Sequence, residues 1–193
     1  MRKAVLTLTK NNLMGSENLL QDFNLLATTA RGNERQMIHE ILYLLKETLG
    51  DQSAEASKTG VRGLITARTA LNPCEAIEKF KAILHERPYE FRYALRILPI
   101  EKVVATELEA IVTSAAELSS GIGENETFRI TVEKRFTTLH AQEIVEAVAT
   151  RIDRRVNLDN PDKVLLIEIV GKFTGASVIK PDLILSVPKE KML

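Results

Sequence analysis

The chain has 193 residues, of which 45% are hydrophobic and 27% charged, as is usual for a globular protein of one large or two small domains. Its 26 basic and 26 acidic residues cancel, so any surface for nucleic acid must be a local patch rather than a property of the whole molecule. The single cysteine, Cys74, excludes an internal disulfide and a cysteine-rich zinc or iron–sulfur site.

The first residues predict a strand rather than a targeting sequence. Residues 4–9 contain only a short apolar run, which is too short for the core of a signal peptide, and residues 11–18 follow as a polar loop. No stretch approaches the roughly 18 apolar residues that a membrane-spanning helix needs. The sequence therefore predicts a cytoplasmic protein without a membrane contact.

The first hundred residues predict an α+β unit of the ferredoxin-like kind, because strand patterns alternate with amphipathic helices. The expected elements are strands at 24–29, 61–68 and 91–98, and helices at 33–49 and 72–87. Asn33 and Gln36 have the spacing of a capping box, and Gly50 is placed to end that helix. Asn72 followed by Pro73 predicts the start of the second helix.

The second half predicts an α/β domain, joined to the first by a short junction near residues 99–106. Thr106 and Glu109 have capping-box spacing before one helix, and Thr138 or His140 is expected to cap the next. The expected strands are at 127–136, 164–170 and 177–186, with a glycine-flanked loop at 171–175. The short junction indicates that the two halves pack rigidly together.

Catalytic chemistry finds little support in the residues. His39 and His85 lie on amphipathic helices near polar neighbours and are expected to be surface residues. Cys74 lies in the first turn of a helix, where the dipole lowers a thiol pKa, but the sequence places no His or Asn beside it. No phosphate-binding glycine motif and no metal-ligand cluster is evident, so we expect no cofactor and no metal. An enzyme that uses Cys74 or His140 stays open as an alternative.

A local basic patch is the stronger signal. Lys134 and Arg135 end a strand just before a helix, whose first backbone N–H groups would add to the attraction for a phosphate. Lys172 lies in the later loop, where Gly171 and Gly175 would let a backbone approach closely. With 5% aromatic residues and no Trp, a sheet of exposed stacking aromatics is not expected. The alternative is that the basic pair only balances nearby acidic residues.

Residues 101–188 resemble a THUMP domain, a module that recognises RNA and usually tRNA. The residues that carry the resemblance are Phe128-Arg129-Ile130, Lys134-Arg135, Val156-Asn-Leu-Asp-Asn-Pro161 and Ile167-Glu168-Ile169. The third is the most specific, since the family has a closely similar phrase before its next strand. Residues 24–100 resemble the ferredoxin-like domain that precedes THUMP in this family. The resemblance divides the chain into an N-terminal ferredoxin-like domain, 1–100, and a THUMP domain, 101–193.

The resemblance implies a tRNA-binding protein, not an enzyme, which presents the acceptor stem and 3′ end to a separate modification enzyme. Two such domains resemble the archaeal and eukaryotic THUMP adaptor of tRNA cytidine N4-acetylation, so the implied partners are tRNA and an acetyltransferase. The implied RNA contacts are Lys134, Arg135, Thr138, His140, Lys172 and Gly175, with Arg62 and Arg68 extending along the tRNA body.

Other interpretations stay open beside this one. The protein could be a stand-alone tRNA-binding or RNA-binding protein or chaperone with no role in acetylation, or a protein-interaction module that has lost its RNA contact. Alternation would place Arg62 and Arg68 on one face of their strand, either as an RNA track or as solvated charges. Exposed edge strands would permit dimerisation, so the oligomeric state is open as well.

Overall fold

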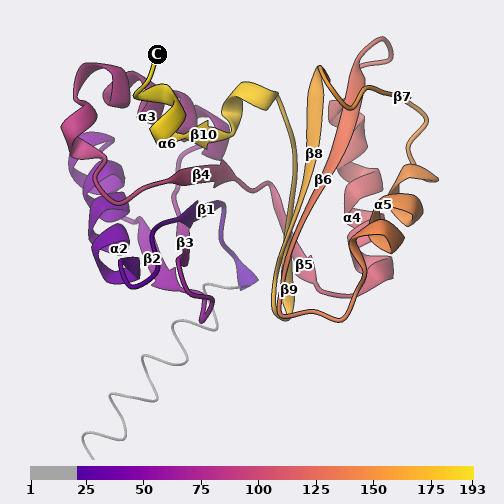
Figure 1. The fold of residues 1–193 in the computed structure, drawn as a ribbon, viewed down its shortest axis with the longest axis horizontal. Helices are drawn as coiled ribbons and strands as arrows, with labels where there is room; N and C mark the ends of the chain where they lie inside the picture. Colours follow the sequence, from indigo (N-terminus) through magenta and orange to yellow (C-terminus); the bar gives the residue numbers. More distant parts are fainter. Residues whose placement is uncertain (1–20) are drawn as a thin grey trace, which may run out of the picture.

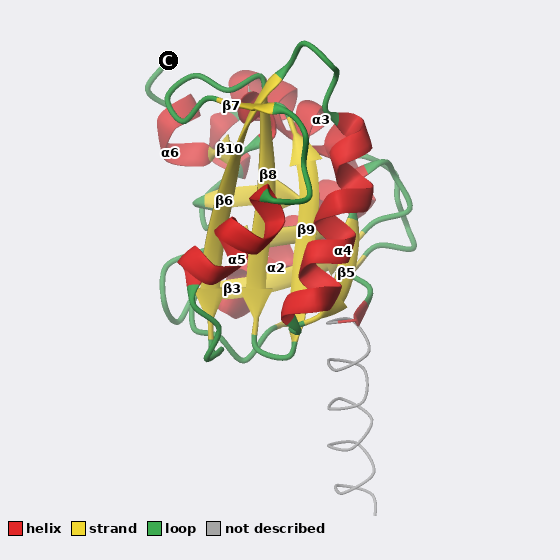
Figure 2. Cartoon of the chain, turned by 90° about the vertical axis from the view of Figure 1, so that its right-hand side faces the viewer, coloured by secondary structure: helices red, strands yellow, loops and turns green. Residues whose placement is uncertain are grey.

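The computed structural model describes residues 21–193, so the expected strand at 4–9 and the loop at 11–18 lie outside the described residues. These residues form two five-stranded sheets whose strands run crosswise (Figure 1). Helices α4 (Leu108–Leu118) and α5 (Ala141–Ala149) cover the outer face of the second sheet (Figure 2). The expected α+β class is confirmed. None of the helices within this part of the chain is long and apolar enough to cross a membrane.

The first sheet has the ferredoxin-like arrangement expected from the sequence. Its elements are β1 (Leu25–Thr28), α2 (Glu34–Tyr43), β2 (Glu55–Lys58), β3 (Leu64–Arg68), α3 (Pro73–Glu86) and β4 (Arg96–Pro99). The strand order is β10-β4-β1-β3-β2, and every pairing is antiparallel. The added strand β10 (Leu185–Ser186) and the short helix α6 (Val187–Glu190) come from the end of the chain, which returns to the first domain (Figure 1).

Two helix starts expected from capping patterns turned out differently. At α3, the Asn72 side chain accepts hydrogen bonds from the backbone N–H groups of Cys74 and Glu75, at 2.9 and 3.3 Å, so that prediction is confirmed. At α2, Asn33 makes no side-chain cap. Glu34 lies next to it and accepts instead from the N–H groups of Gly32 and Gly63, so the capping-box prediction is wrong.

The predicted strand at 61–68 begins only at Leu64. Gly63 has a φ of 76°, and a Cβ there would lie 2.7 Å from the carbonyl oxygen of Thr29, so the chain turns sharply before β3. Arg62 lies in that turn, whereas Arg68 ends the strand. The prediction that these two arginines share one strand face is therefore wrong. The edge strand β2 was not predicted, because four polar or small residues give it no apolar alternation.

The second sheet mixes parallel and antiparallel strands in the order β5-β9-β8-β6-β7. Its strands are β5 (Lys102–Ala105), β6 (Thr127–Arg135), β7 (Arg155–Val156), β8 (Lys163–Val170) and β9 (Phe173–Ile179). The central strand β8 pairs parallel with β6 and antiparallel with β9. On β8, Leu165 and Ile167 pack with the core under α4 and α5, while Val164 and Leu166 join the core of the first domain. Burial on both faces accounts for its nearly continuous apolar run.

Strand β9 starts earlier than expected and lies against the first domain. The loop expected at 171–175 is shorter, because β9 already begins at Phe173. The strand expected at 177–186 is divided, since β9 ends at Ile179 and only Leu185–Ser186 forms a further strand, β10. Gly175 lies inside β9, and a Cβ there would be 3.0 Å from Ile100 and 3.2 Å from Phe23. Its missing side chain lets the first domain approach the sheet closely, which is the physical role of this glycine.

Because of Asp51, the free energy of unfolding is expected to fall as the pH is lowered into the acid range. Its buried carboxylate accepts hydrogen bonds from Ser53, from the Thr69 hydroxyl at 2.5 Å and from the Ala70 N–H at 2.8 Å. Burial opposes ionisation, but these bonds outweigh it and lower the pKa of Asp51 from 3.8 to about 2. Because the folded-state pKa is the lower one, this stabilisation is present above about pH 4 and is lost as the pH falls towards 2.

The measurement is urea unfolding of the wild type and of Asp51→Asn from pH 7 to pH 2. The variant is expected to be less stable by about 2 kcal/mol at pH 7, because buried donors lose a charged acceptor. The gap between the two proteins should narrow below pH 4. A gap of constant size across this range would show that the charge of Asp51 does not contribute.

Candidate nucleic-acid interface

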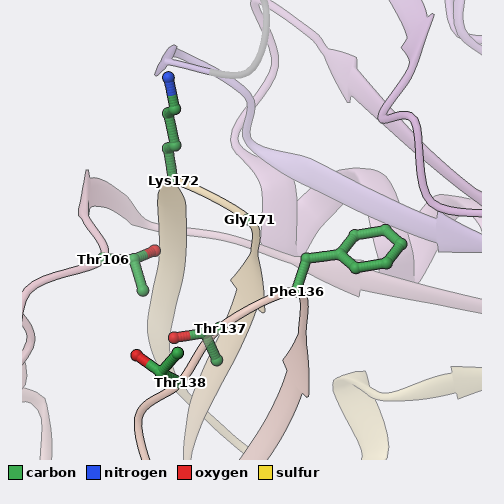
Figure 3. A pocket seen from close by; sticks show the side chains of 6 residues that line it. All are labelled: Thr106, Phe136, Thr137, Thr138, Gly171 and Lys172. Carbon is green, nitrogen blue, oxygen red and sulfur yellow. The ribbon is translucent and has the colours of Figure 1, made fainter.

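Three chain segments leave the second sheet at the same edge and line an open hollow of about 500 Å³. Because β6 and β8 are parallel, both end at this edge, and the turn from β8 into β9 lies there too. Strand β5 runs antiparallel to β9 and also ends there. The residues that line the hollow are Thr106, Phe136, Thr137, Thr138, Gly171 and Lys172 (Figure 3).

Backbone hydrogen bonds hold the three segments together. The N–H of Gly171 donates to the carbonyl of Arg135 at 2.9 Å, and the N–H of Thr106 donates to the carbonyl of Lys172 at 2.9 Å. The hydroxyl of Thr106 lies 2.9 Å from that of Thr174 instead of capping α4. The predicted Thr106–Glu109 capping box is therefore wrong, and Thr106 serves the edge of the sheet instead.

The hollow offers hydroxyls and positive charge. Thr106, Thr137 and Thr138 bring three hydroxyls, and Figure 3 shows Lys172 extending outward from the rim. Lys134 is exposed beside the hollow and donates from its ammonium to the carbonyl of Leu139 at 2.9 Å. Neither lysine forms an ion pair with another residue of 21–193. Such a mixture of hydroxyls and ammonium groups without a paired carboxylate suits phosphate oxygens.

Arg135, predicted as an RNA contact, does not line the hollow. Its guanidinium donates at 2.9 Å to Glu168, whose side chain is 1% exposed. Burial raises the pKa of Glu168, while the charge and hydrogen bond of Arg135 act in the opposite direction. The arginine is therefore engaged with a buried carboxylate. A direct contact between Arg135 and RNA stays a prediction.

The other predicted contacts are scattered. Gly175 is buried inside β9, so its expected place in a loop is wrong, and its contact with RNA stays a prediction. His140 is exposed at the start of α5, where neither it nor Thr138 caps the helix through its side chain. Arg62 and Arg68 are exposed on the first domain, and Arg68 pairs with Asp22. The edge of the second sheet thus brings together two predicted contacts, Thr138 and Lys172, with Lys134 beside them.

Phe136 is the lining residue that sequence reasoning missed. The apolar alternation of Phe128, Ile130 and Val132 is interrupted by Lys134, so it does not indicate where the ring of Phe136 lies. The strand ends at Arg135, and Phe136 has a φ of 57°. This left-handed conformation turns the ring outward, where it is 78% exposed. The exposed ring follows from this turn, which was missed because the strand was expected to continue through Phe136.

Cys74 lacks the environment of a nucleophile. Burial raises the pKa of its thiol, and the charges of Glu101 and Glu78 add to the shift, so the thiol is protonated at neutral pH. The lowering expected from the helix dipole is therefore not found. Within residues 21–193 no group of three or more His, Cys, Asp or Glu side chains is placed to hold a metal ion.

Comparison with known proteins places this edge in a recognised module. Residues 105–178 match the family model of the THUMP domain. This part of the chain is a THUMP domain. All six residues that line the hollow belong to it, and the ferredoxin-like domain precedes it. The comparison with curated proteins found no match.

Solved structures share the fold of both domains. PH1313 from Pyrococcus horikoshii is 21% identical with a TM-score of 0.60, over 82% of this chain and 55% of that one. TrmN from Thermus thermophilus is 15% identical with a TM-score of 0.55, over 83% and 47%. A 4-thiouridine synthetase in complex with RNA and ATP is 14% identical with a TM-score of 0.52, over 82% and 41%. The chain thus spans less than two thirds of the length of each, and these identities show the fold alone.

Proposed function

We propose that this protein binds tRNA through the hollow of its THUMP domain and presents the acceptor stem and 3′ end to a separate modifying enzyme. The observation that carries the proposal is the group of three threonine hydroxyls and Lys172, with Lys134 beside it, on one edge of the domain. The similar 4-thiouridine synthetase was solved with RNA, which supports a role of this fold in RNA binding. Since net charge is zero, binding depends on this local patch.

The first test is tRNA binding at two salt concentrations by the wild type and by Lys134→Ala/Lys172→Ala. Each lysine that contacts a phosphate contributes close to one unit to the salt slope, so the variant is expected to lose about 1.5 to 2 units. We expect its affinity at low salt to fall at least tenfold, the scale of charge-assisted hydrogen bonds. Intact tRNA should bind more tightly than tRNA trimmed of its 3′ end.

A matched control removes the same charge elsewhere. Lys79 on α3 and Lys189 on α6 are exposed on the first domain, so Lys79→Ala/Lys189→Ala lowers the net charge equally without touching the hollow. We expect this control to bind nearly as well as the wild type. Equal losses in both double variants would show that only bulk charge matters and would contradict a site in the hollow.

The partner enzyme that we propose is the tRNA cytidine N4-acetyltransferase. The expected result is that the enzyme forms N4-acetylcytidine in tRNA only when wild-type protein is added, and forms little with Lys134→Ala/Lys172→Ala. The main alternative is a stand-alone tRNA-binding protein or chaperone. It would bind tRNA with the same salt dependence and leave the yield of acetylcytidine unchanged.

A further inference from the structure

Phe136 is exposed and has a backbone conformation that a bulky residue rarely adopts. Its φ of 57° lies in the left-handed region, and it is the one non-glycine residue with positive φ among residues 21–193. The ring is 78% exposed, so packing does not offset the cost of this conformation. The surrounding turn is fixed on both sides, since the Arg135 carbonyl accepts from Gly171 and the Thr137 hydroxyl accepts from the Leu139 N–H at 3.2 Å.

We infer that Phe136 is the stacking platform for an unpaired nucleobase of the bound RNA, an inference that rests on the proposed function. Figure 3 shows the ring projecting from the rim, away from the hydroxyls of Thr137 and Thr138. A base stacked on the ring would place its sugar and phosphate beside those hydroxyls and Lys172. A solvent-exposed aromatic next to a basic patch is the usual combination for single-stranded nucleic acid.

The surroundings favour a nucleobase over a protein partner. Two other apolar residues of this domain are exposed, Val156 and Leu158. They lie in and just after β7, which pairs with the start of β6. Phe136 follows the opposite end of β6. Phe136 thus lines the same hollow as three threonine hydroxyls and Lys172 and does not belong to an apolar patch. One ring can cover one base, whereas protein interfaces bury a contiguous group of apolar side chains.

The test separates the ring from the stability of the fold. Phe136→Gly removes the ring and suits the left-handed backbone, so it is expected to raise the melting temperature while it weakens tRNA binding about tenfold. Phe136→Tyr keeps a ring and should bind as the wild type does. Leu158→Ala, which removes a side chain that is 66% exposed, is the matched control and should leave binding unchanged.

A direct readout uses the absence of Trp from the sequence. Phe136→Trp creates a single indole, whose fluorescence should be quenched by RNA with an intact 3′ nucleotide. RNA ending in an abasic nucleotide keeps the phosphates and should quench much less. If the wild type binds no tRNA, the proposed function and this inference both fall. If the wild type binds and Phe136→Gly binds equally well, or the abasic end quenches equally, only the stacking inference is overturned.

Discussion

Replacing Glu40 with alanine is expected to destabilise the protein by about 3 kcal/mol or more. The Glu40 carboxylate is 8% exposed and accepts hydrogen bonds from the N–H groups of Arg92, Tyr93 and Ala94 at 2.7, 2.9 and 2.9 Å. Each buried donor left without a partner costs about 1–3 kcal/mol, and the N–H of Ala94 is fully buried. Unfolding in guanidinium chloride would measure the loss.

The control for this variant is Glu47→Ala, which removes an exposed carboxylate from the next stretch of the same helical segment. It should change stability by less than about 0.5 kcal/mol. Glu40→Gln should fall between the two, since its amide keeps one acceptor oxygen but turns an N–H₂ group towards backbone donors. Equal stability of Glu40→Ala and Glu47→Ala would show that the three hydrogen bonds contribute nothing.

The same three bonds explain why the strand predicted at 91–98 begins only at Arg96. Alternation of Phe91, Tyr93 and Leu95 suggests an extended strand, but only Arg96–Pro99 pairs as β4. In a ladder, neighbouring N–H groups point to opposite sides, so three successive N–H groups cannot pair with one acceptor. A glutamate 52 to 54 positions earlier supplies that acceptor. No local pattern within the segment reveals such a distant partner.

Sequence patterns predicted the structure correctly where the residues that determine it are close together in the chain. Asn72 and Pro73 predicted the start of α3, and Gly50, with a φ of 80°, follows the helical segment that it was expected to end. The ferredoxin-like order also followed from the alternation of strands and helices. The Asn33 cap did not form, and the neighbouring Glu34 instead accepts from the N–H of Gly63, a partner 29 residues away that no local pattern reveals.

The candidate site was predictable only in part, because some of its residues come together only through contacts between distant parts of the chain. Lys172 and Thr138 follow strands and carry suitable chemistry, so sequence reasoning could propose them. Thr106 and Phe136 join them because β5, β6 and β8 all end at one edge, which is a property of the sheet order. Gly175 illustrates the opposite error, since a glycine needed for close packing between domains looks the same in sequence as one in a flexible loop.

Replacing Arg135 with alanine is expected to destabilise the fold by about 3 kcal/mol at pH 7. The change leaves Glu168, which is 1% exposed, without the guanidinium that donates to it at 2.9 Å. Glu168 lies on β8 on the same face as Leu166 and Val170, which pack with the first domain. Loss of the partner therefore leaves a buried carboxylate without its hydrogen-bonded cation near the contact between the two domains.

The pH dependence and a double variant identify this cause. Burial raises the pKa of Glu168, so the destabilisation should be small near the unfolded pKa of 4.5 and grow as the pH rises. Arg135→Leu/Glu168→Leu should recover most of the loss, because apolar residues replace buried ion pairs at little cost. Arg129→Ala, on the same face of β6, removes an exposed bond to the Leu158 carbonyl and should cost less than about 1 kcal/mol.

A pH-independent loss that the double variant does not recover would mean that Arg135 acts by packing alone. The stability of Arg135→Ala also determines how the tRNA affinity of this variant is interpreted. If Arg135→Ala loses stability as expected, weaker tRNA binding by that variant reflects a disturbed edge and does not identify a phosphate contact. The stability-restored Arg135→Leu/Glu168→Leu variant then tests contact directly: normal tRNA affinity would assign Arg135 to the fold, and reduced affinity would assign it to the RNA surface beside Lys134 and Lys172.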